Sequence, residues 1–469
     1  MKGRLNRRTF LKSAGLGAAA LALPGGLLAG GATPAGQRPN LLFVFADQMH
    51  GFAMGCMGDA GYRTPHLDRL AKAGTLFRNT YSCAPLCTPF RATLFTGRYG
   101  SQTGVLGNSK PLPAGARTLA DCLNDGGWRT GYVGKWHLGG AGNTAVPPEL
   151  RGGFAEFIGY QCYNDYEKNV LFFDENGNPV DCGKHRTDAT TDLAIQRLER
   201  MAGRPWALVV SYQNPHYPVQ PAPEYAAMLK DAAIARRPNC RDIDPYTATA
   251  SPPSPRPKDQ DPVFQRYGNN LDMYLRLYRA MVMQLDANVG RLLAALDRLG
   301  LGGKTAVVFT SDHGDMAGSH GLKNKSVPWE ESSRIPLIVR APGSPAGQVV
   351  DAPASSVDFL PTCLGLVGLP PMPGAEGADL SGVVRGGAAD PKRPVFSELG
   401  GWCLVRQGPL KLVARRPALQ PEHLFNLETD PYEMKDLVDD PAHAPAREAL
   451  LAILRDWNGR VTQAKTKGR

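Results

Sequence analysis

The sequence predicts an α/β fold: a large mixed, mostly parallel sheet flanked by helices, followed by a smaller C-terminal α+β domain that carries an antiparallel sheet. Apolar runs such as 41–45 (LLFVF) are continuous, which indicates strands buried on both faces of a sheet. Helical patterns separate these runs, as in proteins that alternate strands and helices. Beyond a Gly/Ala/Pro-rich stretch at 381–395 the expected strands form a separate, smaller group.

The expected elements follow in chain order. After the first strand, Thr64 is expected to cap a helix with Pro65 at its first position, and Gly74 to end it. Further strands are expected within WRTGYVGKWHLGG, PWALVVSYQNPHYP and KTAVVFTSDHGD. Apolar residues at steps of three and four from 274 to 299 predict a long helix that ends at Gly300. PVFSEL and GPLKLVAR are expected strands near the C-terminus, and REALLAILRDW a closing helix.

The N-terminus has the pattern of an export signal. Residues 1–32 combine a basic segment with an apolar stretch rich in small residues, and the Arg7-Arg8 pair resembles a twin-arginine signal. The apolar stretch is short and interrupted by Gly and Pro, so we expect removal of the signal and no stable membrane insertion afterwards; a membrane anchor is the alternative. The twin-arginine export machinery is therefore an expected partner, and a periplasmic or secreted location is expected.

Charge and cysteine content exclude few classes of protein function. The formal net charge is +10, and residues 1–32 hold five of these charges, which leaves a mild excess for the rest. No basic run is interleaved with aromatic residues, so nucleic-acid binding is not expected. Nine cysteines leave at least one without an intrachain partner, and the pairing of the others stays open. A Pro-rich stretch at 218–262 is expected to be a long surface insertion that shapes a binding site.

Polar residues follow four of the expected strands. In open α/β sheets ligands bind beyond the carboxyl ends of the strands, so these residues are expected to meet at one site. The four clusters are Asp47-Gln48, Lys135-Trp136-His137, Asn214-Pro215-His216 and Asp312-His313.

The segment CAPLCTPFRATLFTGRYG at 83–100 has the pattern of a loop that leads into a helix. Pro89 fits a first helical position, so Thr88 is the expected cap and Cys87 is expected just before a helix that ends near Gly97. Amide groups at a helix start favour anions and lower the pKa of a thiol. Arg91 lies one turn into that helix. A buried thiol, a disulfide with the nearby Cys83 and a reaction centre are the three interpretations.

This segment resembles the signature of a known enzyme family. Cys87-Thr88-Pro89-x-Arg91 with the trailing Thr96-Gly97 is similar to the C-x-P-x-R signature of the sulfatases, members of the alkaline-phosphatase-like superfamily. Other segments resemble further blocks of that family, in family order: PNLLFVFADQ, TPHLDRLAKAGTLFRNTYS, GKWHLG, NPHYP, SDHGDMAGSHGLKNKSVPWEESSRIPLIVR and LFNLETDPYEMKDL. Besides the export signal at 1–32, the expected parts are a catalytic domain at 37–380, which the resemblance implies, and a C-terminal subdomain at 381–469.

The resemblance also implies a reaction. A maturation enzyme converts Cys87 to formylglycine, whose hydrate attacks the sulfur of a sulfate ester, and the covalent sulfoenzyme then collapses by elimination. One divalent cation, with calcium the first expectation and magnesium the second, neutralises sulfate oxygens and acidifies the nucleophile. Its implied ligands are Asp47, Gln48, the modified Cys87, Asp312 and His313; many relatives carry Asp where Gln48 stands.

Positive side chains complete the implied site. Lys135 and Arg91 steady formylglycine and sulfate, and His137 is the base for collapse of the intermediate. His216 and Lys325 hold sulfate and help to protonate the leaving oxygen. His320 is a weaker candidate. The histidines interpreted as structural are His50, His66, His185 and His423.

The leading hypothesis is a sulfuric ester hydrolase acting on a carbohydrate or aryl sulfate. One alternative is a phosphonate monoester or phosphodiester hydrolase of the same superfamily. The alternative from another class is a catalytically silent glycan-binding protein, which predicts that a site residue is missing; none of the main positions lacks its residue.

Overall fold

The computed structural model describes residues 38–247 and 257–463. The predicted export signal and part of the Pro-rich insertion lie outside these residues. Within them, no helix has the length and apolar character needed to cross a membrane.

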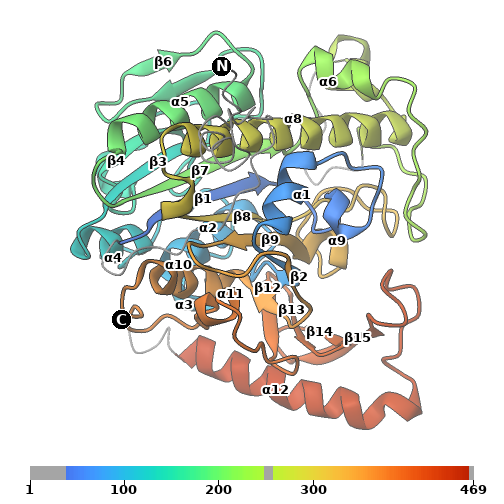
Figure 1. The fold of residues 1–469 in the computed structure, drawn as a ribbon. Coiled ribbons are helices and arrows are strands. Elements are labelled where there is room, and N and C mark those ends of the chain that lie inside the picture. The colour runs from blue at the N-terminus through green and yellow to red at the C-terminus, as the bar shows by residue number, and fades with distance from the viewer. Residues whose placement is uncertain (1–37, 248–256, 464–469) are drawn as a thin grey trace, which may run out of the picture.

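A large mixed sheet forms the centre of the molecule (Figure 1). Among the described residues its eleven strands run in the order β10-β2-β9-β8-β1-β7-β3-β4-β5-β6, with β11 paired to β2. Strands β8, β1, β7, β3 and β4 are parallel, whereas β9 is antiparallel to both of its neighbours. The strands are β1 (Asn40–Asp47), β2 (Thr75–Tyr81), β3 (Arg129–Lys135), β4 (Glu156–Tyr160), β5 (Leu171–Phe173), β6 (Pro179–Asp181), β7 (Trp206–Pro215), β8 (Thr305–Ser311), β9 (Arg334–Arg340), β10 (Gln348–Val350) and β11 (Ala354–Ser355).

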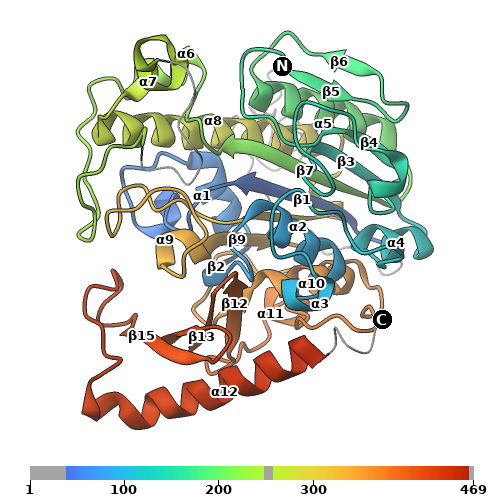
Figure 2. The same cartoon turned by 180° about the vertical axis from the view of Figure 1, so that it is seen from behind.

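Helices cover both faces of this sheet, as Figures 1 and 2 show from opposite sides. The helices are α1 (Pro65–Lys72), α2 (Cys87–Thr96), α3 (Gly100–Thr103), α4 (Leu119–Asp125), α5 (Arg186–Met201), α6 (Pro223–Met228), α7 (Pro262–Tyr267), α8 (Leu271–Arg298), α9 (Glu330–Ser333), α10 (Phe359–Val367), α11 (Ser381–Val384) and α12 (Ala444–Gln463). One face packs on α1, α5 and α8, and the other on α2, α4 and α10.

Strand β1 shows why the sequence folds into this sandwich. Its side chains alternate between the two faces, so that Leu42 and Val44 join the core under α8 while Phe43 and Phe45 join the core under α2. Every residue of β1 is buried. A continuous apolar run is therefore what a strand covered on both faces requires.

A second, four-stranded antiparallel sheet follows in the C-terminal part of the described residues, with α12 packed against it (Figure 1). Its strands are β12 (Val395–Leu399), β13 (Trp402–Gln407), β14 (Leu410–Arg415) and β15 (Gln420–Asn426). Trp457 of α12 stacks on Phe396 of β12 and contacts Tyr99 of the large domain edge-on, so the two parts share a core. The domain boundary at 380/381 stays a prediction.

The structure corrects the predicted start of helix α2 and excludes the disulfide interpretation of Cys83 and Cys87. Helix α1 begins at Pro65 after Thr64 as predicted, and α8 ends before Gly300 but begins at Leu271, one turn earlier than its apolar pattern. Helix α2 begins at Cys87, not after it, because the Phe90 N–H bonds to the Leu86 carbonyl and closes a first turn that includes Pro89. The missing amide hydrogen of Pro89 costs nothing there, since first-turn amides have no helical partner. All nine cysteines lie in described residues and are free, which rules out the Cys83–Cys87 disulfide here.

Candidate active site

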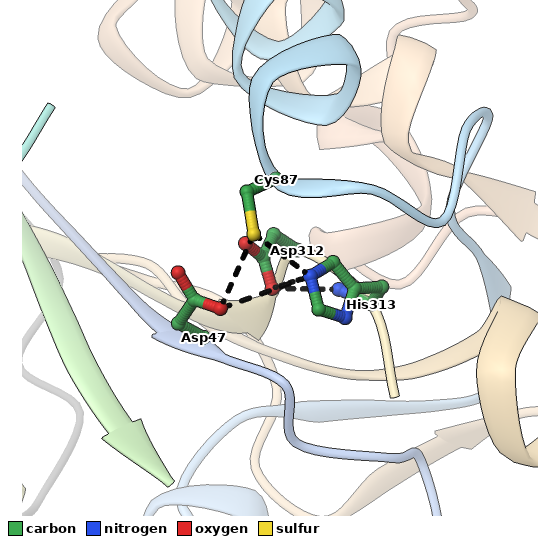
Figure 3. Close-up of side chains that lie close together, drawn as sticks. All are labelled: Asp47, Cys87, Asp312 and His313. Carbon is green, nitrogen blue, oxygen red and sulfur yellow. Dashed lines mark hydrogen bonds and ion pairs between the residues drawn. The ribbon is translucent and has the colours of Figure 1, made fainter. Parts of the chain in front are cut away.

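The carboxyl ends of β1 and β8 and the start of α2 meet at one buried group of side chains (Figure 3). One ligand atom each from Asp47, Cys87, Asp312 and His313 lies within 4.8 Å of the others. Cys87 Sγ is 3.2 Å from His313 Nε2 and 3.6 Å from Asp47 Oδ1. Figure 3 shows the functional ends of these side chains pointing toward a common centre. The sequence prediction that these strand ends converge is therefore confirmed in space.

Helix α2 presents Cys87 at its first position. Thr88 does not cap the helix: its Oγ1 donates to the His137 carbonyl (2.6 Å) and accepts from the Ser109 amide (3.1 Å), which ties α2 to the loop after β3. Burial would raise the pKa of Cys87, but Lys135, Lys325 and His313 together hold this pKa well below its usual value. The surroundings of Cys87 thus favour a negative charge at this position.

Two buried cations hold the carboxylates in place. Lys135 Nζ lies 2.7 Å from Asp47 Oδ2, and Arg91 Nη2 lies 3.1 Å from the same oxygen and 3.7 Å from Asp312 Oδ2. Burial opposes ionisation of Asp47, but Lys135, His216 and Arg91 bring its pKa below the usual value. Arg91, expected to steady formylglycine and sulfate, lies against both carboxylates, and its Nη1 donates to the Lys135 carbonyl at 2.5 Å.

The group fits a divalent cation. Burial and the neighbouring Asp47 raise the pKa of Asp312 to about 7, which marks a carboxylate without enough positive charge beside it. Asp312 Oδ2 is buried and accepts no hydrogen bond from any described residue. Two carboxylates converging in this way are the ligands that a hard cation requires.

Gln48 stands beside this group, and both ends of its amide are hydrogen-bonded to other side chains. Its Oε1 accepts a hydrogen bond from Lys325 Nζ (2.8 Å), and its Nε2 donates to Asp315 Oδ2 (2.6 Å) and Asn324 Oδ1 (3.1 Å). Asp315 thus fixes which end of the amide points toward Lys325. Asp315 was not recognised from the sequence as a neighbour of the site, although it lies only three residues after Asp312 in the segment SDHGD.

His216 and Lys325 form a close pair above Cys87. Lys325 Nζ is 2.7 Å from His216 Nε2 and 3.6 Å from Cys87 Sγ. His216 Nδ1 donates to the Tyr217 carbonyl at 2.5 Å, which leaves Nε2 as the acceptor. Burial and the charge of Lys325 lower the pKa of His216 to about 4, so His216 is neutral at pH 7 and Lys325 carries the proton between them.

His137 enters the site from the loop after β3. Burial would lower the pKa of His137, but the neighbouring Cys162 and Cys87 raise it above the usual value. Cys162 was not recognised as a neighbour of the site from the sequence. The register explains its position: Tyr160 of β4 pairs with Lys135 of β3, so Cys162 follows β4 at the level of His137.

His320 lies outside the group, so the structure does not bring this weaker candidate to Cys87. It stacks on Trp329 at 4.2 Å and is 3.1 Å from Asn239 Nδ2. Two acids beside it are already paired: Glu331 with Arg237 (2.8 Å) and Glu433 with Lys411 (2.7 Å). Because these cations compensate the carboxylates, we assign no metal to the group His320, Glu331 and Glu433.

A mixed, mostly parallel sheet with acids, a histidine and a buried cysteine gathered at its carboxyl edge is typical of the alkaline-phosphatase-like class of hydrolases. The sulfatase family model matches residues 39–369. The chain therefore belongs to the sulfatase family, and its reaction class is hydrolysis of sulfuric esters.

Individual relatives agree with this assignment. An ulvan-active sulfatase of Formosa agariphila is 32% identical over 89% of this chain and 80% of its own length. A solved structure of a putative sulfatase from Bacteroides fragilis has a TM-score of 0.79 at 27% identity, covering 94% of this chain and 99% of that one. A phosphonate monoester hydrolase from Silicibacter pomeroyi has a TM-score of 0.74 at 24% identity, over 90% and 96% of the two chains, which shows likeness of fold alone.

Proposed function

We propose that Cys87, oxidised to formylglycine, is the nucleophile of this sulfatase. The observation that carries the proposal is the position of Cys87 Sγ, which lies 3.6 Å from Lys325 Nζ, 3.9 Å from Lys135 Nζ and 3.6 Å from Asp47 Oδ1. A formylglycine hydrate at this position supplies the attacking hydroxyl group. Because the Cys87 side chain is buried, the formylglycine-generating maturation enzyme must act before folding is complete.

We propose that Asp47, Asp312 and His313 hold one divalent cation, calcium in the first place and magnesium in the second, together with the side chain at 87. The cation, when bound, supplies positive charge to the sulfate oxygens and makes the attacking hydroxyl more acidic. Gln48 Oε1 accepts one hydrogen bond from Lys325 and keeps a second lone pair, so we propose that Gln48 both orients Lys325 and serves as a further ligand.

The chain's own side chains take three further roles in this proposal. Arg91 and Lys135 hold the two carboxylates, and Lys135 also faces the sulfate position. His137, a neighbour of the side chain at 87, receives the proton released on collapse. Lys325 donates a proton to the leaving oxygen, and His216 orients it through the 2.7 Å contact.

The proposed substrate is a sulfate ester of a carbohydrate or an aryl alcohol. A relative that acts on ulvan supports the carbohydrate. The described part of the Pro-rich insertion reaches the loop that bears Lys325, where it can contact the substrate. We further propose a catalytic domain at 37–380, a C-terminal subdomain at 381–469, and twin-arginine export to a periplasmic or secreted location. Replacement of both Arg7 and Arg8 by Lys should then leave the protein in the cytoplasm.

One experiment tests the nucleophile. The protein is made with and without a co-expressed maturation enzyme, and the tryptic peptide 79–91 is examined by mass spectrometry. Sulfate release should rise with the fraction of peptide in which Cys87 has lost its thiol, while Cys83 in the same peptide stays a thiol. Sulfate release by protein with an intact Cys87 thiol would contradict the proposal.

The substrate class is tested on the fully converted protein. Aryl sulfate, sulfated oligosaccharides, a phosphonate monoester and a phosphodiester are compared by kcat/KM. A higher value for a sulfate ester is expected. A higher value for the phosphonate or diester would favour the related hydrolases, and glycan binding without turnover would favour a silent binding protein.

A further inference from the structure

A second lysine near the site, Lys323, is buried in a cage of tyrosines. Its side chain is only 7% exposed. Its Nζ lies 4.6 Å from the ring centroid of Tyr217, 4.9 Å from that of Tyr274 and 5.4 Å from that of Tyr267. The same ammonium group donates a hydrogen bond to the Pro245 carbonyl. A buried ammonium group is unfavourable unless it is compensated, and three aromatic faces and a carbonyl provide that compensation.

The cage joins segments that are far apart in the sequence. Tyr217 belongs to the turn after β7, and Pro245 to the Pro-rich insertion. Tyr267 ends α7, and Tyr274 lies in the first turns of α8. Lys323 itself comes from the loop after β8, so one side chain holds these segments together. Burial lowers the pKa of Lys323 to about 8 against the opposing effect of Asp315 and Asp244, so the side chain is mainly charged at pH 7.

Both members of the His216–Lys325 pair are attached to this cage. The Tyr217 carbonyl accepts the Nδ1–H of His216 at 2.5 Å, and the Tyr217 ring rests on the ammonium group of Lys323. The position of Tyr217 therefore sets the rotation of the His216 ring.

Lys325 is attached through its own loop. It lies two residues after Lys323, and the intervening Asn324 is held at its backbone: its N–H donates to Asp315 Oδ1 at 3.1 Å and its carbonyl accepts from the Met316 amide at 2.7 Å. The ammonium group of Lys323 is thus anchored between the turn after β7, which bears His216, and the loop that bears Lys325.

We propose that Lys323 is a positioning residue that fixes His216 and Lys325 relative to each other and clamps the Pro-rich insertion beside them. This inference rests on the proposed function, because it assigns protonation of the leaving oxygen to that pair. Within the described residues, Lys323 makes no hydrogen bond, ion pair or ring contact with Cys87 or with the proposed cation ligands. It therefore acts on the reaction through Tyr217 and the loop 313–326.

The leaving group provides a readout that separates positioning from packing. A poor leaving group, such as an unactivated sugar alcohol, needs proton donation by the pair, whereas 4-nitrophenolate departs with little help. Displacement of Lys325 or His216 should therefore slow a sugar sulfate more than 4-nitrophenyl sulfate. A loss of folded protein would slow both equally.

The experiment compares Lys323→Met and Lys323→Arg with a matched control, Lys258→Met. Lys258 also lies over aromatic rings, Tyr246 of the insertion at 5.8 Å and Phe264 of α7 at 5.4 Å, and in the described part of the chain it makes no ion pair, hydrogen bond or ring contact with Tyr217 or the loop 313–326. Lys323→Met should lower kcat for the sugar sulfate about tenfold more than kcat for 4-nitrophenyl sulfate. Lys323→Arg, which keeps the charge over the rings, should recover part of that difference, and Lys258→Met should show none.

Several outcomes overturn the inference: equal losses on the two substrates, no loss in Lys323→Met, or the same discrimination in Lys258→Met. If Lys323→Met does not fold, the ratio of the two kcat values is measured for Lys323→Arg. The guanidinium group keeps the positive charge in the cage but places it differently from the lysine ammonium group. An unchanged ratio then counts against the inference. Failure of the proposed function is distinguishable, because the unsubstituted, fully converted protein would then release sulfate from neither substrate.

Discussion

Lys325 Nζ lies 2.7 Å from His216 Nε2, and the other ring nitrogen of His216 is held by the Tyr217 carbonyl. The pair therefore has one proton between its two nitrogens, carried by Lys325. Lys325 Nζ stands 3.6 Å from Cys87 Sγ, and His216 Nε2 lies 3.9 Å from Asp47 Oδ1. The site thus combines carboxylates that suit a cation with ammonium groups that suit an anionic ester.

Substitution of Cys87, the proposed nucleophile, should abolish turnover. Cys87→Ala is expected to lower kcat/KM for an aryl sulfate at least about a thousandfold, because no other side chain can accept the sulfo group. The matched control is Cys83→Ala: Cys83 is equally buried but lies against Ser355 (3.0 Å) rather than the site. The measurement is sulfate release by matured protein. Substantial activity in Cys87→Ala would refute the assignment.

Divalent cations should stabilise the folded protein. Calcium at about a hundred times its dissociation constant should raise the free energy of unfolding by about 2.7 kcal/mol. Asp312→Asn should remove most of this gain, because it removes one of the two buried carboxylates. Glu331→Gln is the control, since Glu331 is already paired with Arg237. Urea unfolding with and without calcium, and then magnesium, measures the effect; equal stabilisation of Asp312→Asn would contradict it.

Arg91 should be needed for stability before any chemistry occurs. Its side chain is fully buried between Asp47 and Asp312, so Arg91→Met leaves two carboxylates facing each other and should cost about 3 kcal/mol. Arg98→Met, an exposed position at the end of the same segment, should cost far less. Both variants are compared without the maturation enzyme in calcium-free buffer. Calcium should restore part of the free energy of unfolding that Arg91→Met loses. A loss of stability in Arg91→Met no larger than that in Arg98→Met would contradict the prediction.

Stability should fall in mild acid because of His185. This histidine caps α5: its Nδ1 accepts from the Thr187 amide (3.2 Å) and from Gln284 Nε2 (3.0 Å), while its Nε2 contacts the Gln220 carbonyl (2.9 Å). Burial lowers the pKa of His185 below 6.5, the value expected in the unfolded chain. Below pH 6.5 the unfolded chain therefore binds a proton that the folded protein excludes, and stability is lost as the pH falls.

The test replaces His185 by Asn, which caps helices well and does not titrate. The free energy of unfolding of His185→Asn should decline less between pH 7.5 and pH 5.5 than that of the unsubstituted protein. At pH 7.5 the two should differ by about 1 kcal/mol or less. Parallel declines for both proteins would show that another group is responsible.

Several parts of the site could be predicted from the sequence because they are local. Asp47 and Asp312 directly follow or end buried strands, and parallel strands deliver their carboxyl ends to one edge. Cys87 and Arg91 share one turn of a helix. The start of that helix was predicted wrongly, because Pro89 is tolerated anywhere in the first turn and the choice of turn depends on a contact with Leu86.

The roles that depend on long-range contacts were out of reach. Which end of the Gln48 amide faces Lys325 is decided by Asp315, 267 residues away. The nearness of Cys162 to His137 depends on the register of β3 and β4, and the tyrosine cage of Lys323 assembles from four segments. None of these contacts produces a periodicity or a motif of fixed spacing that a single sequence could display.

By itself, then, the sequence determined the kind of strands, the order of the chemical groups and the family to which they belong. Hydrophobic burial on two faces and short motifs act over a few residues, so one chain displays them directly. The tertiary structure alone decided which cation compensates which carboxylate and which nitrogen of His216 accepts a proton. Those choices depend on distances of about 3 Å between residues that only the closed sheet brings together.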